Sequence, residues 1–135
     1  MTMKTYIGKK TILAMPMAKS EAEKVLNRSL AQSNGGEEGY LIQYYDGYKS
    51  WSPKNIFERS YRIAETSLDL MRIESAQLKN NIMTLRLSIF TLVRKTPKEN
   101  HEMLQAQLDA MLRYDEILDM RIKEKEAEET YKSKI

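Results

Sequence analysis

Apolar residues recur at intervals of three, four or seven along residues 60–125, and this spacing constrains the fold more than any other feature. Such a spacing places side chains along one face of a helix. The pattern therefore predicts two long amphipathic helices. The first carries Met71, Leu78, Ile82, Leu85, Ile89 and Leu92. The second carries Leu104, Leu108, Met111, Leu118 and Ile122.

A short polar segment, residues 94–100, separates these two helices. Thr96 precedes Pro97, and a residue before proline is disfavoured in helical conformation. Asn100 is placed to cap the second helix. Folding the chain back at Pro97 predicts an antiparallel helical hairpin. The pairs brought together would be Leu92 with Leu104, Ile89 with Leu108 and Leu85 with Met111.

Each helix also carries a second apolar row beside the first. Two rows on one helix require more than one neighbour, and long exposed apolar rows are typical of interfaces. The pattern favours a homo-oligomer, and the alternative is that the N-terminal half of the chain covers the second rows. The row on the first helix is Ala76, Met83, Leu87 and Phe90, and the row on the second is Met103, Ala106, Ala110, Tyr114 and Ile117.

The first third of the chain has the pattern of strands and one short helix. Residues 4–17 are rich in strand formers, and Pro16 is expected to end the strand or place it at a sheet edge. Residues 20–30 are expected to be helical, because their apolar residues lie on one side and Ser20 stands three residues before Glu23, as in a capping box.

The aromatic-rich stretch of residues 39–51 predicts a β-hairpin. Asp46-Gly47 at its centre favours a type I′ turn, which needs positive φ at both residues. Ser52-Pro53 then predicts a helix with serine as N-cap and proline at the first helical position. Whether this helix continues unbroken into the hairpin or bends near residues 65–67 stays open.

The predicted fold class is therefore α+β: a small N-terminal antiparallel β-sheet with a short helix, followed by a long antiparallel α-helical hairpin. The expected domains are residues 1–58, which are β-rich, and residues 59–128, which form the hairpin. The mixed-charge stretch from Glu124 to Ile135 is expected to fray, with residues 129–135 as a charged tail.

The residue types required for catalysis or metal binding are scarce. The chain has no cysteine and one histidine, His101, so neither a metal site nor a cofactor is expected, and the chain does not have the pattern of an enzyme. No long apolar run indicates a signal peptide or a membrane span, which favours the cytosol.

Charge is distributed unevenly between the two predicted helices. No acidic residue occurs between Glu74 and Glu99, whereas the second helix is acidic. Opposite charges on paired helices attract, and a basic lining also suits an anionic ligand. The basic interval holds Lys79, Arg86, Arg94, Lys95 and Lys98, and the acidic residues are Asp109, Asp115, Glu116 and Asp119.

Polar residues interrupt the apolar rows, with Ser75 and Asp115 in the predicted seam, the latter near Asn81. These interruptions either fix the register of the helices or line a polar pocket between protomers. Arginines suit phosphates, and aromatic rings suit a base. The candidate ligand-binding residues are Trp51, Asn80, Arg86, Phe90, Arg94, Arg113, Tyr114 and Arg121.

Two segments are similar to known phage proteins. Residues 39–58 (GYLIQYYDGYKSWSPKNIFE), preceded by residues 6–17 (YIGKKTILAMPM), resemble a segment of small phage proteins from Gram-positive hosts. Residues 104–122 (LQAQLDAMLRYDEILDMRI) resemble the helical hairpin of phage Thoeris anti-defence and anti-CBASS sponge proteins.

This resemblance implies a homo-hexamer that acts in the host cytoplasm and binds host cyclic nucleotide signals without cleaving them. The implied ligands are the cyclic ADP-ribose isomers of Thoeris, and some hairpin relatives also take cyclic di- or trinucleotides. No nucleic acid or membrane partner is expected. The alternative is a nucleic-acid-binding or scaffolding phage protein, in which the basic interval contacts a phosphate backbone.

Overall fold

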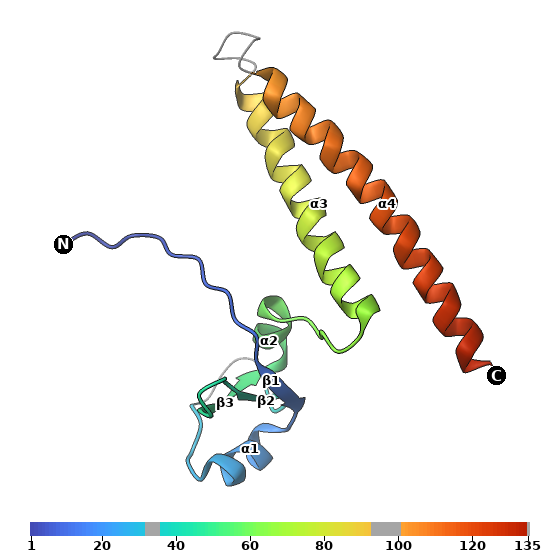
Figure 1. Ribbon diagram of the computed structural model, residues 1–135. Helices are drawn as coiled ribbons and strands as arrows, with labels where there is room; N and C mark the ends of the chain where they lie inside the picture. The colour runs from blue at the N-terminus through green and yellow to red at the C-terminus, as the bar shows by residue number, and fades with distance from the viewer. Residues whose placement is uncertain (32–35, 93–100, 135) are drawn as a thin grey trace. The chain divides into compact units, whose positions relative to one another are not determined.

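The computed structural model describes residues 1–31, 36–92 and 101–134 (Figure 1). The chain divides into two compact units, Met1–Arg62 and Ile63–Ile135. The first contains a small antiparallel sheet with short helices, and the second contains two long helices packed together, so the predicted α+β fold class is confirmed.

Three antiparallel strands form the sheet of the first unit, in the order β1-β2-β3. They are β1 (Leu13–Pro16), β2 (Gly39–Gln43) and β3 (Lys49–Pro53). Pro16 ends β1 at an edge of the sheet, as predicted. The strand begins only at Leu13, however, so the expectation of strand structure in residues 6–12 was wrong.

The central strand β2 supplies most of the core of the first unit. Leu41 and Ile42 are successive residues, so their side chains point to opposite faces of the sheet, and both are buried. Helix α1 (Lys19–Leu26) contacts β3, and helix α2 (Lys54–Ser60) contacts β2 and β3. A buried Ala22 shows the covered side of α1.

The β2–β3 hairpin has a three-residue loop instead of the predicted type I′ turn. The Gly47 N–H donates to the Tyr44 carbonyl at 2.9 Å, and the Tyr44 N–H donates to the Tyr48 carbonyl at 2.8 Å. Gly47 has φ +91°, but Asp46 does not have positive φ. These bonds are typical of a three-residue hairpin loop in which a turn is followed by a glycine in the left-handed conformation. The sequence Asp-Gly is compatible with this loop as well as with a type I′ turn.

Two predicted helix caps are wrong, because other residues start these helices. Ala18 is the N-cap of α1, and the Ser20 N–H donates to a Glu37 carboxylate oxygen at 3.2 Å, so the cap comes from a distant loop. Pro53 is the N-cap of α2, and Ser52 remains in β3 because its strand pairing with Tyr40 extends that far.

The second unit consists of helix α3 (Ser67–Leu92) and helix α4 (Glu102–Ser133), which pack against each other (Figure 1). Its core contains the predicted seam residues Met71, Leu78, Ile82, Leu108 and Leu118. Leu85, Ile89, Met111 and Ile122 are partly buried against this core. The expected turn at residues 94–100, including the Asn100 cap, lies outside the described residues.

A reciprocal cap separates α2 from α3, which answers the question that the sequence left open. The Asp69 N–H donates to Thr66 Oγ1, and the Thr66 and Glu65 N–H groups donate to Asp69 Oδ2, each at 3.0 Å. These bonds hold the pKa of the Asp69 carboxyl below its ordinary value, chiefly through the Thr66 N–H. Thr66 and Asp69 therefore form a capping box.

The end of the chain is helical through Ser133, so the expectation that it frays from Glu124 was wrong. Lys125 and Lys132 both pair with Glu128, at 3.5 and 3.9 Å, within the helix. Glu126 reaches Arg72 of α3 at 3.7 Å. The two pairs within the helix, at spacings of three and four residues, each stabilise it by about 0.2–0.5 kcal/mol.

Candidate ligand-binding surfaces of the helical hairpin

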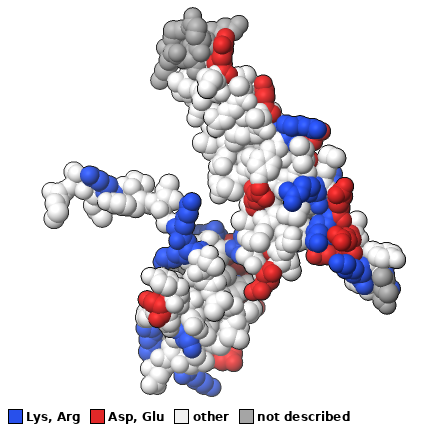
Figure 2. Space-filling view, viewed as in Figure 1, with Lys and Arg blue, Asp and Glu red and all other residues white. Residues whose placement is uncertain are grey.

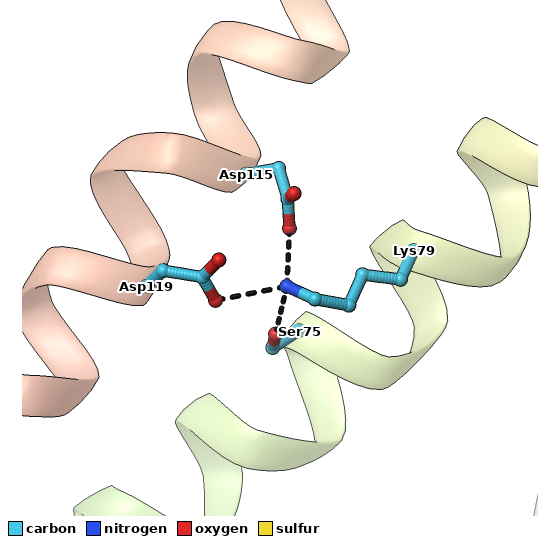
Figure 3. A network of polar contacts seen from close by, with 4 residues as sticks. All are labelled: Ser75, Lys79, Asp115 and Asp119. Carbon is cyan, nitrogen blue, oxygen red and sulfur yellow. Dashed lines mark hydrogen bonds and ion pairs between the residues drawn. The ribbon is translucent and has the colours of Figure 1, made fainter.

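A polar layer interrupts the apolar seam between α3 and α4 (Figure 3). Lys79 Nζ of α3 donates to Asp115 Oδ1 at 2.6 Å and to Asp119 Oδ1 at 2.8 Å, both on α4. It also donates to the hydroxyl of Ser75 at 3.1 Å. Ser75 is itself buried in the seam. We refer to Ser75, Lys79, Asp115 and Asp119 as the polar layer.

The polar layer acts as a register device. Hydrogen bonds from Lys79 to Asp115, and next to Asp119, raise the pKa of the lysine above its ordinary value. A shift of the helices by one turn would leave the partly buried Asp115 without this cation. At Lys79, the structure supports attraction between the helices as the explanation of the uneven charge, rather than a basic lining for an anionic ligand. A separate ion pair between the two helices, Arg72–Glu126, lies on the same flank, seven residues before Lys79 on α3 and seven after Asp119 on α4.

The second apolar rows are exposed on the hairpin. On α3, Met83, Leu87 and Phe90 keep 61–63% of their surface in contact with solvent. On α4, Met103 is 82% exposed, and Tyr114 and Ile117 are each 42% exposed. These side chains cover little of the seam between the helices. The hairpin therefore presents apolar surface well beyond what its own packing requires.

Helix geometry places Asn80 and Phe90 on the outer side of α3 and Arg86 on a flank of that helix. Asn80 falls in the same row as Met83, Leu87 and Phe90, at intervals of three and four residues. Arg86 lies seven residues after Lys79, so it continues the flank that carries the ion pairs to α4. Arg86, Asn80 and Phe90 are all exposed.

The candidate residues of α4 lie away from that flank. Tyr114 and Arg121 are seven residues apart and occupy the flank opposite Asp119. Arg113 falls in the outer row before Ile117, and its guanidinium pairs with Glu116 at 3.0 Å. Arg113, Tyr114 and Arg121 are all exposed. The α3 and α4 candidates therefore form two groups on opposite sides of the hairpin.

Two candidates stand apart from these groups. Trp51 belongs to the first unit, where its indole N–H donates to the Met17 carbonyl at 2.8 Å and its ring packs over Gly39. The indole therefore has a structural role, because it links β3 to the segment between β1 and α1. Arg94 lies outside the described residues.

Within residues 1–31, 36–92 and 101–134, no group of three or more histidine, cysteine, aspartate or glutamate side chains is arranged to hold a metal ion. His101 is the N-cap residue of α4 and makes no side-chain capping hydrogen bond. In the same described residues, no helix is both long enough and apolar enough to cross a membrane.

The match to a known protein family lies in the helical hairpin. Residues 65–124 match the Sequestin family. The Sequestin match begins at the capping box of α3 and extends over α3 and most of α4, which is less than half of the chain. No curated protein and no solved structure matches the chain.

The name of the matched family indicates sequestration, which is a binding role. The Sequestin match covers seven of the eight candidate residues, all except Trp51. The family name carries no ligand, so the chemistry of the hairpin surfaces has to indicate one.

Proposed function

We propose that this protein is a phage-encoded sponge that sequesters host cyclic nucleotide signals in the host cytoplasm without cleaving them. The signals would be the cyclic ADP-ribose isomers of Thoeris and, in addition, CBASS cyclic di- or trinucleotides. The observation that carries the proposal is the Sequestin match over the hairpin. Sequestration requires affinity and no turnover.

The pocket would form between protomers, because the two groups of candidate residues face away from each other on one hairpin. The α3 group offers an amide, a guanidinium and an aromatic ring in Asn80, Arg86 and Phe90. The α4 group offers two guanidinium groups and a phenol. Joining the α3 side of one chain to the α4 side of another would place arginines for phosphates beside aromatic rings for a base.

The exposed apolar rows support the same assembly. Each row lies beside one group of candidate residues, so covering a row with a second chain would also complete a pocket. Figure 2 shows that the half of the hairpin nearest residues 93–100 presents a largely uncharged surface on the visible face. A contact between two different faces of the chain forms a ring when its rotation closes, and the proposed homo-hexamer would be such a ring.

The experiment that tests the pocket is a titration of the Arg113→Ala, Arg121→Ala double variant with cyclic ADP-ribose isomers. Each arginine–phosphate contact is a charge-assisted hydrogen bond worth on the order of 1.5 kcal/mol or more. We therefore expect affinity to fall at least about a hundredfold, with an unchanged elution volume on size exclusion.

The matched control is the Arg59→Ala, Arg62→Ala double variant, which removes the same charge from the first unit. It should bind as the native protein does. Equal affinity of the Arg113/Arg121 variant and this control would show that the pocket lies elsewhere.

The nucleic-acid-binding alternative receives less support from the hairpin. Lys79, which opens the basic interval, is engaged by two carboxylates of α4 and is not available for a phosphate backbone. Binding to a long polyanion falls steeply as salt rises. An enclosed small nucleotide should show a much weaker dependence.

A further inference from the structure

A cleft of about 600 Å³ lies in the first unit, outside the residues that match Sequestin. One wall is the extended segment before β1, with Lys9, Lys10 and Thr11. The other wall is the β2–β3 hairpin, with Tyr44, Tyr45 and Tyr48. Clefts of 300–1,000 Å³ are of the size that binds small molecules.

Cations and aromatic rings alternate beside this cleft. The rings of Tyr44 and Tyr48 stack with centroids 5.9 Å apart. Lys10 Nζ lies 5.1 Å from the Tyr44 centroid, and the Arg28 guanidinium lies 5.9 Å from that of Tyr48. Both distances are in the range of cation–π attraction, so the tyrosine pair holds positive charge at the cleft.

The hairpin loop presents a third tyrosine to solvent. Tyr45 is 99% exposed, and it precedes the left-handed Gly47 in a loop closed by two backbone hydrogen bonds. Asp46 is the acidic residue in the lining, and its carboxylate accepts the Tyr48 N–H at 3.0 Å. The lining thus combines two lysines with one carboxylate that already has a donor.

We propose that this cleft binds a phosphate-bearing nucleotide, as a site separate from the pocket of the helical hairpin. The base would stack on Tyr45, because an exposed ring on a fixed loop is a stacking platform. Lys9 and Lys10 would take the phosphates. The hydroxyl of Ser50, which donates to the Tyr44 hydroxyl at 3.3 Å, adds a polar group to the lining.

The test is a calorimetric titration with ADP of the full chain carrying Arg113→Ala and Arg121→Ala, so that binding at the hairpin is suppressed. In this background Tyr45→Ala should weaken ADP binding about tenfold, since base–aromatic stacking is worth roughly 1–3 kcal/mol. Tyr45→Phe should retain it. Tyr131→Ala, which removes an exposed tyrosine from the end of α4, is the matched control.

Lys10→Gln should weaken ADP binding about threefold, as for one exposed charge pair, and Lys134→Gln should leave it unchanged. Equal ADP affinity with and without Tyr45 would overturn the proposal, as would absence of ADP binding. Inorganic phosphate binding as tightly as ADP would also overturn it, because the base would contribute nothing. In the native background, Tyr45→Ala should leave the Arg113- and Arg121-dependent binding of a cyclic ADP-ribose isomer unchanged, so the two sites can fail independently.

Discussion

Lys79 shows how one side chain can set the register of the hairpin. It bridges Asp115 and Asp119, which would otherwise place two negative charges side by side near the seam. The spacing pattern predicted Ser75 and Asp115 as polar interruptions, and it offered register fixing as one explanation. The charge pattern included Lys79 in the predicted attraction between the helices, but it did not pair this lysine with Asp115, because Lys79 lies beside the seam rather than within it.

We expect Lys79→Met to destabilise the hairpin by roughly 1 kcal/mol. Surface pairs contribute up to about 1 kcal/mol, and the partly buried Asp115 would lose its main partner. Thermal unfolding followed by circular dichroism would measure the change. Lys123→Met, at an exposed position of α4, is the control, and equal melting temperatures of the two variants would contradict this role.

The raised pKa of Lys79 gives the same pair a pH dependence. Because the pKa is higher in the folded state, the stabilisation is fully present below the ordinary pKa of lysine and is lost as pH rises through the raised value. The native protein should therefore lose more stability in this alkaline range than Lys79→Met does. Parallel melting-temperature curves for the two proteins would contradict the assignment.

At the scale of elements, periodicity predicted the helices well and local signals predicted their ends poorly. The apolar seam positions of α3 and α4 recur over many turns, so a single position that departs from the pattern does not change the predicted helix. A helix cap depends on one or two residues. At the start of α1 the carboxylate of the distant Glu37, rather than a neighbouring side chain, accepts the Ser20 N–H. The Thr66-to-Asp69 capping box was readable in the sequence but was missed.

The packing of β2 against β3 depends on Gly39. A Cβ at this position would collide with the Ser52 carbonyl oxygen and with the ring of Trp51. Gly39→Ala should therefore destabilise the first unit by roughly 1–3 kcal/mol. Fluorescence of Trp51, the one tryptophan of the chain, would report its unfolding in denaturant.

Gly8→Ala is the matched control for this prediction, because a Cβ there meets no atom within 4 Å. The two variants add the same methyl group to the same unit. An unfolding midpoint of Gly39→Ala equal to that of Gly8→Ala would show that β2 and β3 can separate enough to accept the side chain.

At the scale of the whole molecule, the proposed binding site depends on the apolar surface that a single hairpin leaves exposed. The sequence identified the polar and aromatic residues of the second apolar rows, but a helical pattern assigns a residue to a face and not to a partner. The structure separates those residues into two groups, which the proposed assembly would join. The cleft of the first unit was missed because the aromatic hairpin was interpreted as strand alone.

We expect Leu87→Glu to break the proposed oligomer while leaving the hairpin folded. Leu87 is 63% exposed within the chain, so the charge costs little in the protomer but would be buried at an interface. Light scattering with size exclusion would measure the mass, and circular dichroism the helix content. Thr84→Glu adds the same charge on a neighbouring exposed position. If both variants keep the native mass, α3 does not contribute this row to an interface.

The central claim is that the protein holds a cyclic nucleotide signal without changing it. Calorimetric titration with cyclic ADP-ribose isomers, cyclic dinucleotides and cyclic trinucleotides would identify the ligand. Heat denaturation of the complex would then release it for mass spectrometry and a signalling assay. We predict tight binding of at least one of these nucleotides and its recovery in intact, active form. Recovery of a cleaved nucleotide, or no binding to any of them, would contradict the claim.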